Sequence, residues 1–235
     1  MENTSNLIKN KNVSHNLACI HESPNFMLII RSAKLYSGMM ERELPRQLIH
    51  LSGLLFIVLA QFVGRDVTIT YFLIIALFFL LYSEYVKREE RKLIRVLNRL
   101  EQRFRDFVLR FEREEYLKNP FRGAFWFYFS CALTLLIFPF PIASAACCML
   151  AVGDSFSTLF GVRFGRHRIR RNKTLEGSLA CLLSSFVTGL FFVGPFISLP
   201  GAFAAMLAEL QTKLNDNLTI PLVSGFAMFV VSLFV

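Results

Sequence analysis

The sequence predicts an all-α protein: a polytopic bundle of about seven transmembrane helices with one basic amphipathic helix on the cytoplasmic side. Two observations support this fold class. Apolar residues make up 54% of the 235-residue chain, and they are grouped in blocks of roughly 15–22 residues, whereas a soluble core would spread them with a period of about 2 or 3.6. The charged residues lie between these blocks, so the net charge of +9 belongs to the loops.

The apolar blocks predict the transmembrane spans, because they end at charged residues, glycine or proline. The fourth block is rich in Ala, Ser, Cys and Gly, which let helices approach closely, so we expect it at the centre of the bundle. Before the sixth block, the stretch from Gly194 to Gly201 contains two prolines and is expected to turn the chain. The expected spans cover approximately residues 47–63, 66–86, 121–138, 142–160, 177–194, 201–210 and 218–235.

The remaining segments are polar or amphipathic. Residues 1–40 are expected to form a polar tail, with an interfacial helix at 26–36 because that apolar stretch is too short to span a bilayer. Residues 41–235 form the predicted membrane-embedded domain. Within it, residues 87–118 are highly charged, yet leucine and phenylalanine recur at steps of three and four, which predicts the amphipathic helix. This helix lies on lipid or on the domain; the alternative is a short coiled-coil seam, which leaves a homodimer open.

The predicted spans place the polar segments on one side of the membrane. If residues 41–46 face the cytoplasm, so do the loops at 87–118, 161–176 and 211–217. The turns on the opposite side carry only Arg65 and Asp66 as charges, which agrees with the positive-inside rule. Nucleic-acid binding, the other interpretation of a basic chain, is disfavoured because the basic stretches adjoin the spans.

Residues 153–177 contain the first group of candidate site residues. Asp154 lies within an apolar span, where a carboxylate at mid-bilayer costs about 2.5–3.5 kcal/mol. Basic residues follow at once, so we predict that Asp154 binds a metal ion carried by a nucleotide. The structural alternative is an aspartate that is hydrogen-bonded to the backbone or caps the following turn.

The basic loop after Asp154 is a candidate phosphate site. Gly161 and Gly165 bracket Arg163 and would let the backbone approach a phosphate, with Arg163 and Lys173 supplying positive charge. The other arginines of this loop are better explained by contacts with lipid headgroups. Glu176 and Gly177 open the next span, whose helix N-terminus favours anions, and Glu176 would bind Mg²⁺ or orient Lys173. The loop contains no Walker-type string.

A second polar group contains Glu209, Asp216 and Asn217, and Asn217 is a candidate for nucleotide binding. Asp216 is predicted to share a metal with Asp154, because acids on one face beside cationic loops suit phosphoryl transfer. The alternative is that Asp216 or Asn217 caps the last helix. Arg46 and His50 fall on one face at the entrance of the first span, together with Glu43, and are candidates for lipid contact or support.

Together, these motifs resemble the polyprenol kinase family, which includes dolichol kinase, phytol kinase and CTP-dependent diacylglycerol kinases. The resemblance covers about residues 41–230. One position departs from the family, which usually has an acid where this chain has Asn215. The matching stretches are residues 43–53, 153–161, 163–165, 173–178 and 216–221.

The resemblance implies a membrane-bound kinase that uses CTP and a divalent cation such as Mg²⁺ to phosphorylate a lipid alcohol: dolichol, geranylgeraniol, phytol or diacylglycerol. CTP–Mg²⁺ would bind at the cytoplasmic face, in the cell membrane of a microbe or the endoplasmic reticulum of a eukaryote. Lys173 and Arg163 would neutralise the transferred group, and Asp154 or Glu209 would take the hydroxyl proton. The alternatives are a membrane cytidylyltransferase, whose usual signature is absent, and a small transporter.

Overall fold

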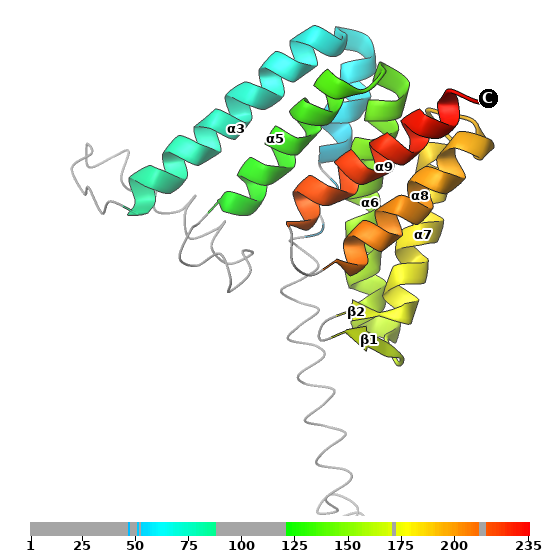
Figure 1. Ribbon diagram of the computed structural model, residues 1–235. Coiled ribbons are helices and arrows are strands. Elements are labelled where there is room, and N and C mark those ends of the chain that lie inside the picture. Colours follow the sequence, from blue (N-terminus) through cyan, green and yellow to red (C-terminus); the bar gives the residue numbers. More distant parts are fainter. Residues whose placement is uncertain (1–46, 48–50, 52, 88–120, 171–172, 212–214) are drawn as a thin grey trace, which may run out of the picture. The chain divides into compact units, whose positions relative to one another are not determined.

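The structure is a computed structural model that describes residues 47, 51, 53–87, 121–170, 173–211 and 215–235 (Figure 1). The described residues are helical apart from turns and one short hairpin, which confirms the all-α class. The hairpin pairs β1 (Arg168–Arg170) with β2 (Lys173–Thr174) in antiparallel register. The helices are Gly53–Val63, α3 (Arg65–Lys87), α5 (Arg122–Ile137), α6 (Phe140–Phe164), α7 (Leu175–Gly189), α8 (Pro195–Leu210) and α9 (Asp216–Ser232).

Several sequence predictions fall outside these residues. The interfacial helix at 26–36, the side chains of Arg46 and His50, and the amphipathic helix beyond Lys87 lie in parts of the chain that the structure does not describe. Within the described part, α3 and α6 are long and apolar enough to cross a membrane, judged by length and composition. The other helices are apolar but have at most 17 residues, which is less than the roughly 20 residues that usually span a bilayer. Seven spans therefore stay a prediction.

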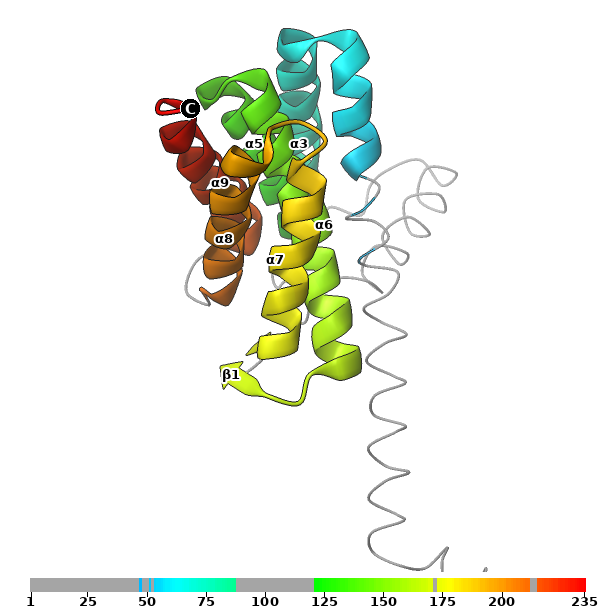
Figure 2. The same cartoon turned by 90° about the vertical axis from the view of Figure 1, so that its right-hand side faces the viewer.

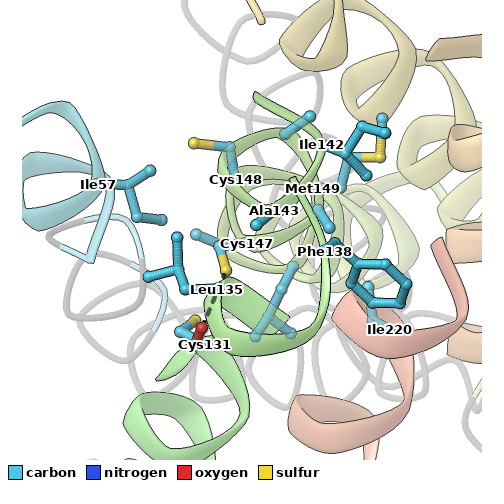
Figure 3. Packing of buried hydrophobic residues seen from close by; sticks show 14 of the residues in the cluster. Ile57, Cys131, Leu135, Phe138, Ile142, Ala143, Cys147, Cys148, Met149 and Ile220 are labelled. Carbon is cyan, nitrogen blue, oxygen red and sulfur yellow. Dashed lines mark hydrogen bonds between the residues drawn. The ribbon is translucent and has the colours of Figure 1, made fainter. Parts of the chain in front are cut away.

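The small residues of α6 place this helix at the centre, as the sequence predicted. It packs against α5, α7, α8 and α9, and Ala143, Cys147 and Met149 are among its fully buried residues (Figure 3). The Sγ atom of Cys147 lies 3.8 Å from the carbonyl oxygen of Cys131 on α5. Small side chains let the neighbouring helices approach the axis of α6, so residues from several helices can meet beside it.

Three boundaries differ clearly from the sequence predictions. The helix expected to run to about residue 194 ends at Gly189. The turn expected over Gly194 to Gly201 ends at Gly194, because α8 already begins at Pro195. Proline is well suited to the first helical position, where its missing N–H costs no hydrogen bond, and Pro200 is accommodated inside the helix. The loop expected to begin at Gly161 begins after Phe164, since α6 continues to that residue.

The turns between helices alternate between two ends of the bundle. At one end, α6 and α8 finish and α7 and α9 begin, close to the hairpin (Figures 1 and 2). At the other end, Arg65 donates from Nε to the carbonyl oxygen of Leu135 at 2.8 Å and from Nη2 to that of Leu136 at 2.9 Å. These bonds satisfy carbonyl groups at the C-terminal end of α5. The candidate site residues Lys173, Glu209 and Asp216 lie at the hairpin end, because β2 carries Lys173, α8 ends beside Glu209 and α9 begins at Asp216.

Candidate active site

An ionic cluster joins the hairpin to α6, α8 and α9. Nζ of Lys173, on β2, lies 2.5 Å from Oε1 of Glu209 and 3.4 Å from Oδ2 of Asp216. Glu209 is near the end of α8, and Asp216 is the first residue of α9. The hydroxyl of Ser157, on α6, donates to the same Oε1 atom of Glu209 at 2.6 Å. We call Ser157, Lys173, Glu209 and Asp216 the ionic cluster.

Burial differs within the ionic cluster. The side chain of Glu209 is 1% exposed, whereas those of Lys173 and Asp216 are 15% and 17% exposed. Burial lowers the pKa of Lys173, but the negative charges of Asp216, Glu209 and Asp154 outweigh it, and the net pKa lies above the usual value for lysine. Lys173 is therefore a fixed cation at neutral pH.

Asp154 lies one helical turn before Ser157 on α6 and is 2% exposed. It acts on Lys173 electrostatically, because its charge contributes to the raised pKa of that lysine. The structure thus brings Asp154, Lys173, Glu209 and Asp216 into one region from four separate segments of the chain. Each of these residues is a candidate predicted from the sequence, and their catalytic and metal-binding roles stay predictions.

Glu176 attaches the hairpin to the start of α7. The backbone N–H of His167 donates to Oε1 and Oε2 of Glu176 at 3.2 and 3.3 Å, and Nδ1 of His167 lies 2.7 Å from Oε1. The pKa of Glu176 is lowered to about 2, first by its own backbone N–H, then by the His167 side chain, and further by the backbone N–H groups of Arg166 and His167. In the structure, Glu176 therefore supports the loop that carries Lys173.

The N-terminus of α7 is capped by Thr174. Its Oγ1 accepts a hydrogen bond from the backbone N–H of Gly177 at 3.2 Å, as is usual for a threonine N-cap. The backbone N–H of Leu175 also donates to the carbonyl oxygen of His167 at 2.9 Å. Lys173 thus stands directly before a fixed helix start, which limits the positions that its side chain can reach.

The start of α9 is capped by Asn215. Its Oδ1 accepts from the backbone N–H of Asn217 at 3.0 Å. The alternative prediction that Asp216 or Asn217 supplies this cap is therefore wrong. Nδ2 of Asn217 donates to the carbonyl oxygen of Gly123 at 3.1 Å, so this side chain joins α9 to α5. A role of Asn217 in nucleotide binding stays a prediction.

The predicted phosphate-binding glycines lie at close contacts. A Cβ atom added to Gly177 would lie 2.7 Å from the carbonyl oxygen of Ser157 and 3.3 Å from Cα of Gly161, and one added to Gly161 would lie 3.2 Å from Oγ1 of Thr174. A Cβ atom on Gly165 would collide with the carbonyl group of Gly161. These glycines let α6, α7 and the hairpin approach one another. Phosphate binding by their backbone stays a prediction.

The arginines near the ionic cluster are mostly exposed. Arg163, in the last turn of α6, is exposed and lies 6.0 Å from the ring centre of Phe164. Arg170 donates from Nη1 to the carbonyl oxygen of Leu210 at 3.3 Å and so links β1 to the end of α8. Arg163 is positioned by the same helix as Asp154, and its contact with phosphate stays a prediction.

Ser157 is not among the candidate residues predicted from the sequence. A serine in an apolar helix usually bonds to its own backbone, so the residue type alone gives no reason to choose it. Its position three residues after Asp154 places it near that acid on α6, and this spacing was the one available signal.

The described residues include carboxylates that could bind a metal ion, but no cluster of metal ligands is found among them. Among them, no three His, Cys, Asp or Glu side chains lie close enough together to hold a metal ion. Mg²⁺ usually binds through one or two carboxylates together with substrate phosphates and water. The carboxylates of Asp154 and Asp216 supply the kind of oxygen ligand that Mg²⁺ prefers, and their predicted binding of a Mg²⁺ ion that arrives with a nucleotide stays a prediction.

The geometry defines the class of protein as an apolar helical bundle with an ionic cluster at one end. No family model and no solved structure matches the chain. Several curated proteins do match. The chain is 30% identical over 134 residues to a probable chloroplastic phytol kinase of Glycine max, over 47% of this chain and 40% of that protein.

Two proteins of Schizosaccharomyces pombe also match. A CTP-dependent diacylglycerol kinase is 27% identical over 135 residues, which is 48% of this chain and 62% of that kinase. A dolichol kinase is 36% identical over 83 residues, or 31% of this chain and 16% of that kinase. The chain thus spans less than two thirds of the length of each of these relatives. Over these stretches it is similar to phytol, diacylglycerol and dolichol kinases, which are the proteins that its motifs resemble.

Proposed function

We propose that the protein is a lipid kinase that transfers the γ-phosphoryl group of CTP to the hydroxyl group of a lipid alcohol. The observation that supports this best is the ionic cluster, which gathers one cation and two carboxylates from separate segments at one end of an apolar bundle. The names of the relatives supply the reaction class, and the diacylglycerol kinase supplies CTP as the donor.

The surface of the bundle suits a protein that spans a membrane. On α3, Ile74, Leu77 and Leu81 are 61%, 54% and 61% exposed, and such a continuous apolar face is rare on soluble monomers. With α3 and α6 across the bilayer, the ionic cluster faces one aqueous side, which we take to be the cytoplasm. The acceptor lipid would keep its chain among the helices and present its hydroxyl group to the cluster.

Each residue of the site has a proposed task. Lys173 binds the γ-phosphate and neutralises the charge that develops during transfer, with Arg163 as a second cation. The acceptor oxygen forms a bond to the γ-phosphorus, the bond from that phosphorus to the β-phosphate oxygen breaks, and CDP leaves. The hydroxyl proton passes to a carboxylate, either Asp154 or Glu209. Asp154 and Asp216 would hold Mg²⁺, which supplies further charge neutralisation when it is bound.

The test is a transfer assay on the purified protein in lipid nanodiscs. The protein is incubated with Mg²⁺, γ-labelled CTP or ATP, and dolichol, geranylgeraniol, phytol or diacylglycerol in separate reactions. The proposal expects label in a lipid phosphate with CTP and release of CDP. Release of pyrophosphate would instead identify a cytidylyltransferase, and substrate flux across proteoliposomes without nucleotide would identify a transporter. Either result would overturn the proposal.

A further inference from the structure

The hydroxyl group of Ser157 is bonded differently from most helical hydroxyl groups in the described residues. Its partner is Oε1 of Glu209, 52 positions away and on another helix. Ser155, two residues earlier on α6, donates to the carbonyl oxygen of Ala151 on its own helix. Bonds to the backbone three or four residues earlier are also made by Ser130, Thr134, Ser178, Thr188 and Ser224.

The buried carboxylate of Glu209 is stabilised by the hydrogen-bond donors around it. A carboxylate that is 1% exposed is costly unless hydrogen bonds and a counter-charge compensate for its burial. Oε1 receives both the Ser157 hydroxyl and the Lys173 ammonium group, whereas Oε2 has no hydrogen-bond partner among the residues that the structure describes. Without the Ser157 hydroxyl, Lys173 is the one donor to this carboxylate within that described part. The carboxylate could then rotate and take the ammonium group with it.

Ser157, Glu209 and Lys173 differ in how far their side chains are exposed to solvent. Ser157 is 5% exposed and Glu209 1%, whereas the Lys173 side chain is 15% exposed. A ligand arriving from solvent therefore meets Lys173 before it meets the two groups behind it. A lysine side chain has many rotamers, so a fixed partner restricts where its ammonium group lies.

We propose that Ser157 is a positioning residue of this site: it holds Glu209, and Glu209 holds the Lys173 ammonium group where the γ-phosphate of the nucleotide arrives. The assignment rests on the proposed kinase function and deepens it. In this role Glu209 acts through Lys173, whichever of Asp154 and Glu209 takes the hydroxyl proton.

The kinetic test compares Ser157→Ala with Ser155→Ala and Ser157→Thr in the CTP-dependent transfer assay. Removing a hydrogen bond to a charged group lowers an affinity or a rate by about 10- to 100-fold. Ser157→Ala is therefore expected to lose about that factor in kcat/KM for CTP, and Ser157→Thr to recover most of it. Ser155→Ala removes an equally buried hydroxyl that serves only its own helix, and it should stay within about threefold of the wild type.

A second measurement does not depend on activity. Lys173 is faced by Asp154 from α6, Cys181 from α7, Glu209 from α8 and Asp216 from α9. Labelling of its amine is followed by mass spectrometry as a time course at one fixed pH. Oε1 of Glu209 lies 2.5 Å from the ammonium group, so a displaced Glu209 should let the amine be labelled faster in Ser157→Ala than in the wild type and in Ser155→Ala.

The outcomes separate this inference from the proposed function. Unchanged kcat/KM and an unchanged labelling profile in Ser157→Ala would overturn the positioning role, as would equal losses in Ser155→Ala. If Ser157→Ala fails to fold, Ser157→Cys keeps the volume with a weaker donor and allows the same comparison. A wild type that phosphorylates no acceptor would refute the kinase function, and the labelling profiles would still decide whether Ser157 positions Lys173.

Discussion

Nζ of Lys173 lies 2.5 Å from Oε1 of Glu209, although the two residues are 36 positions apart in the chain. One is on the hairpin and the other is at the end of α8. The contact is largely buried, so it fixes the hairpin to the bundle and at the same time sets the charge of the site. Changes to either residue should therefore affect both stability and chemistry.

Replacing Lys173 with methionine should destabilise the protein by about 3–5 kcal/mol, because it leaves the buried carboxylate of Glu209 without its counter-charge. The double variant Lys173→Met, Glu209→Gln removes both charges and should be more stable than Lys173→Met by at least about 1 kcal/mol. The measurement is unfolding in detergent, analysed as a double-mutant cycle.

The control for this cycle is Arg168→Gln, which changes an exposed cation of the same hairpin. It should stay within about 0.5 kcal/mol of the wild type. Additive effects of the two single substitutions would show that the ion pair contributes no coupling, which would contradict the structural interpretation.

Replacing Asp154 with asparagine should abolish transfer, with a loss of at least about 100-fold in kcat, while the protein stays folded. Asparagine keeps the size of the side chain but removes the charge that is proposed to bind Mg²⁺ and to act on Lys173. The matched control is Asp66→Asn, because Asp66 lies in the first turn of α3, at the opposite end of the bundle. Near-normal transfer by Asp154→Asn would remove this residue from the mechanism.

Replacing Glu176 with glutamine should loosen the hairpin in a pH-dependent way. The pKa of Glu176 is about 2 in the folded protein, below its usual value of 4.5. The ionised group therefore stabilises the fold fully above about pH 4.5, and this contribution is lost as the pH falls towards 2. Melting temperatures measured from pH 3 to pH 8 should differ between wild type and variant by a constant amount above pH 5, and the two should converge at lower pH.

The opposite trend, with a difference that grows on acidification, would show that Glu176 is not held as a carboxylate by His167. A variant that melts like the wild type at every pH would show that the attachment of the hairpin does not limit stability.

The sequence was sufficient to predict most helices, because alternating apolar blocks and charged loops leave few choices for where a helix begins and ends. The prediction of a turn at Pro195 is wrong, because this proline starts α8. The sequence did not predict the hairpin that carries Lys173, since β1 and β2 have only three and two residues and show no period of their own.

The candidate site could be predicted only residue by residue. Asp154, Lys173 and Asp216 stood out because charged groups beside apolar spans are costly and rarely accidental. The partnership of Ser157 with Glu209 depends on how α6 and α8 approach each other, and hydropathy does not encode that approach. Glycines present the same difficulty, because a close phosphate and a close helix both require the absence of a side chain.

Alanine substitutions can separate these two roles of the glycines. Gly177→Ala places a methyl group 2.7 Å from the backbone oxygen of Ser157, so α6 and α7 must move apart, at a cost of about 1–3 kcal/mol. Gly161→Ala meets Oγ1 of Thr174 at 3.2 Å, which a small adjustment can relieve, and should cost less. Gly123→Ala, with nothing within 4 Å of the added atom, is the control and should not lower stability. If packing is the main role of these glycines, unfolding in detergent should show the largest loss of stability for Gly177→Ala, a smaller loss for Gly161→Ala and none for Gly123→Ala. Equal stability of all three variants, with loss of CTP binding in Gly161→Ala and Gly177→Ala alone, would instead assign both glycines to the phosphate.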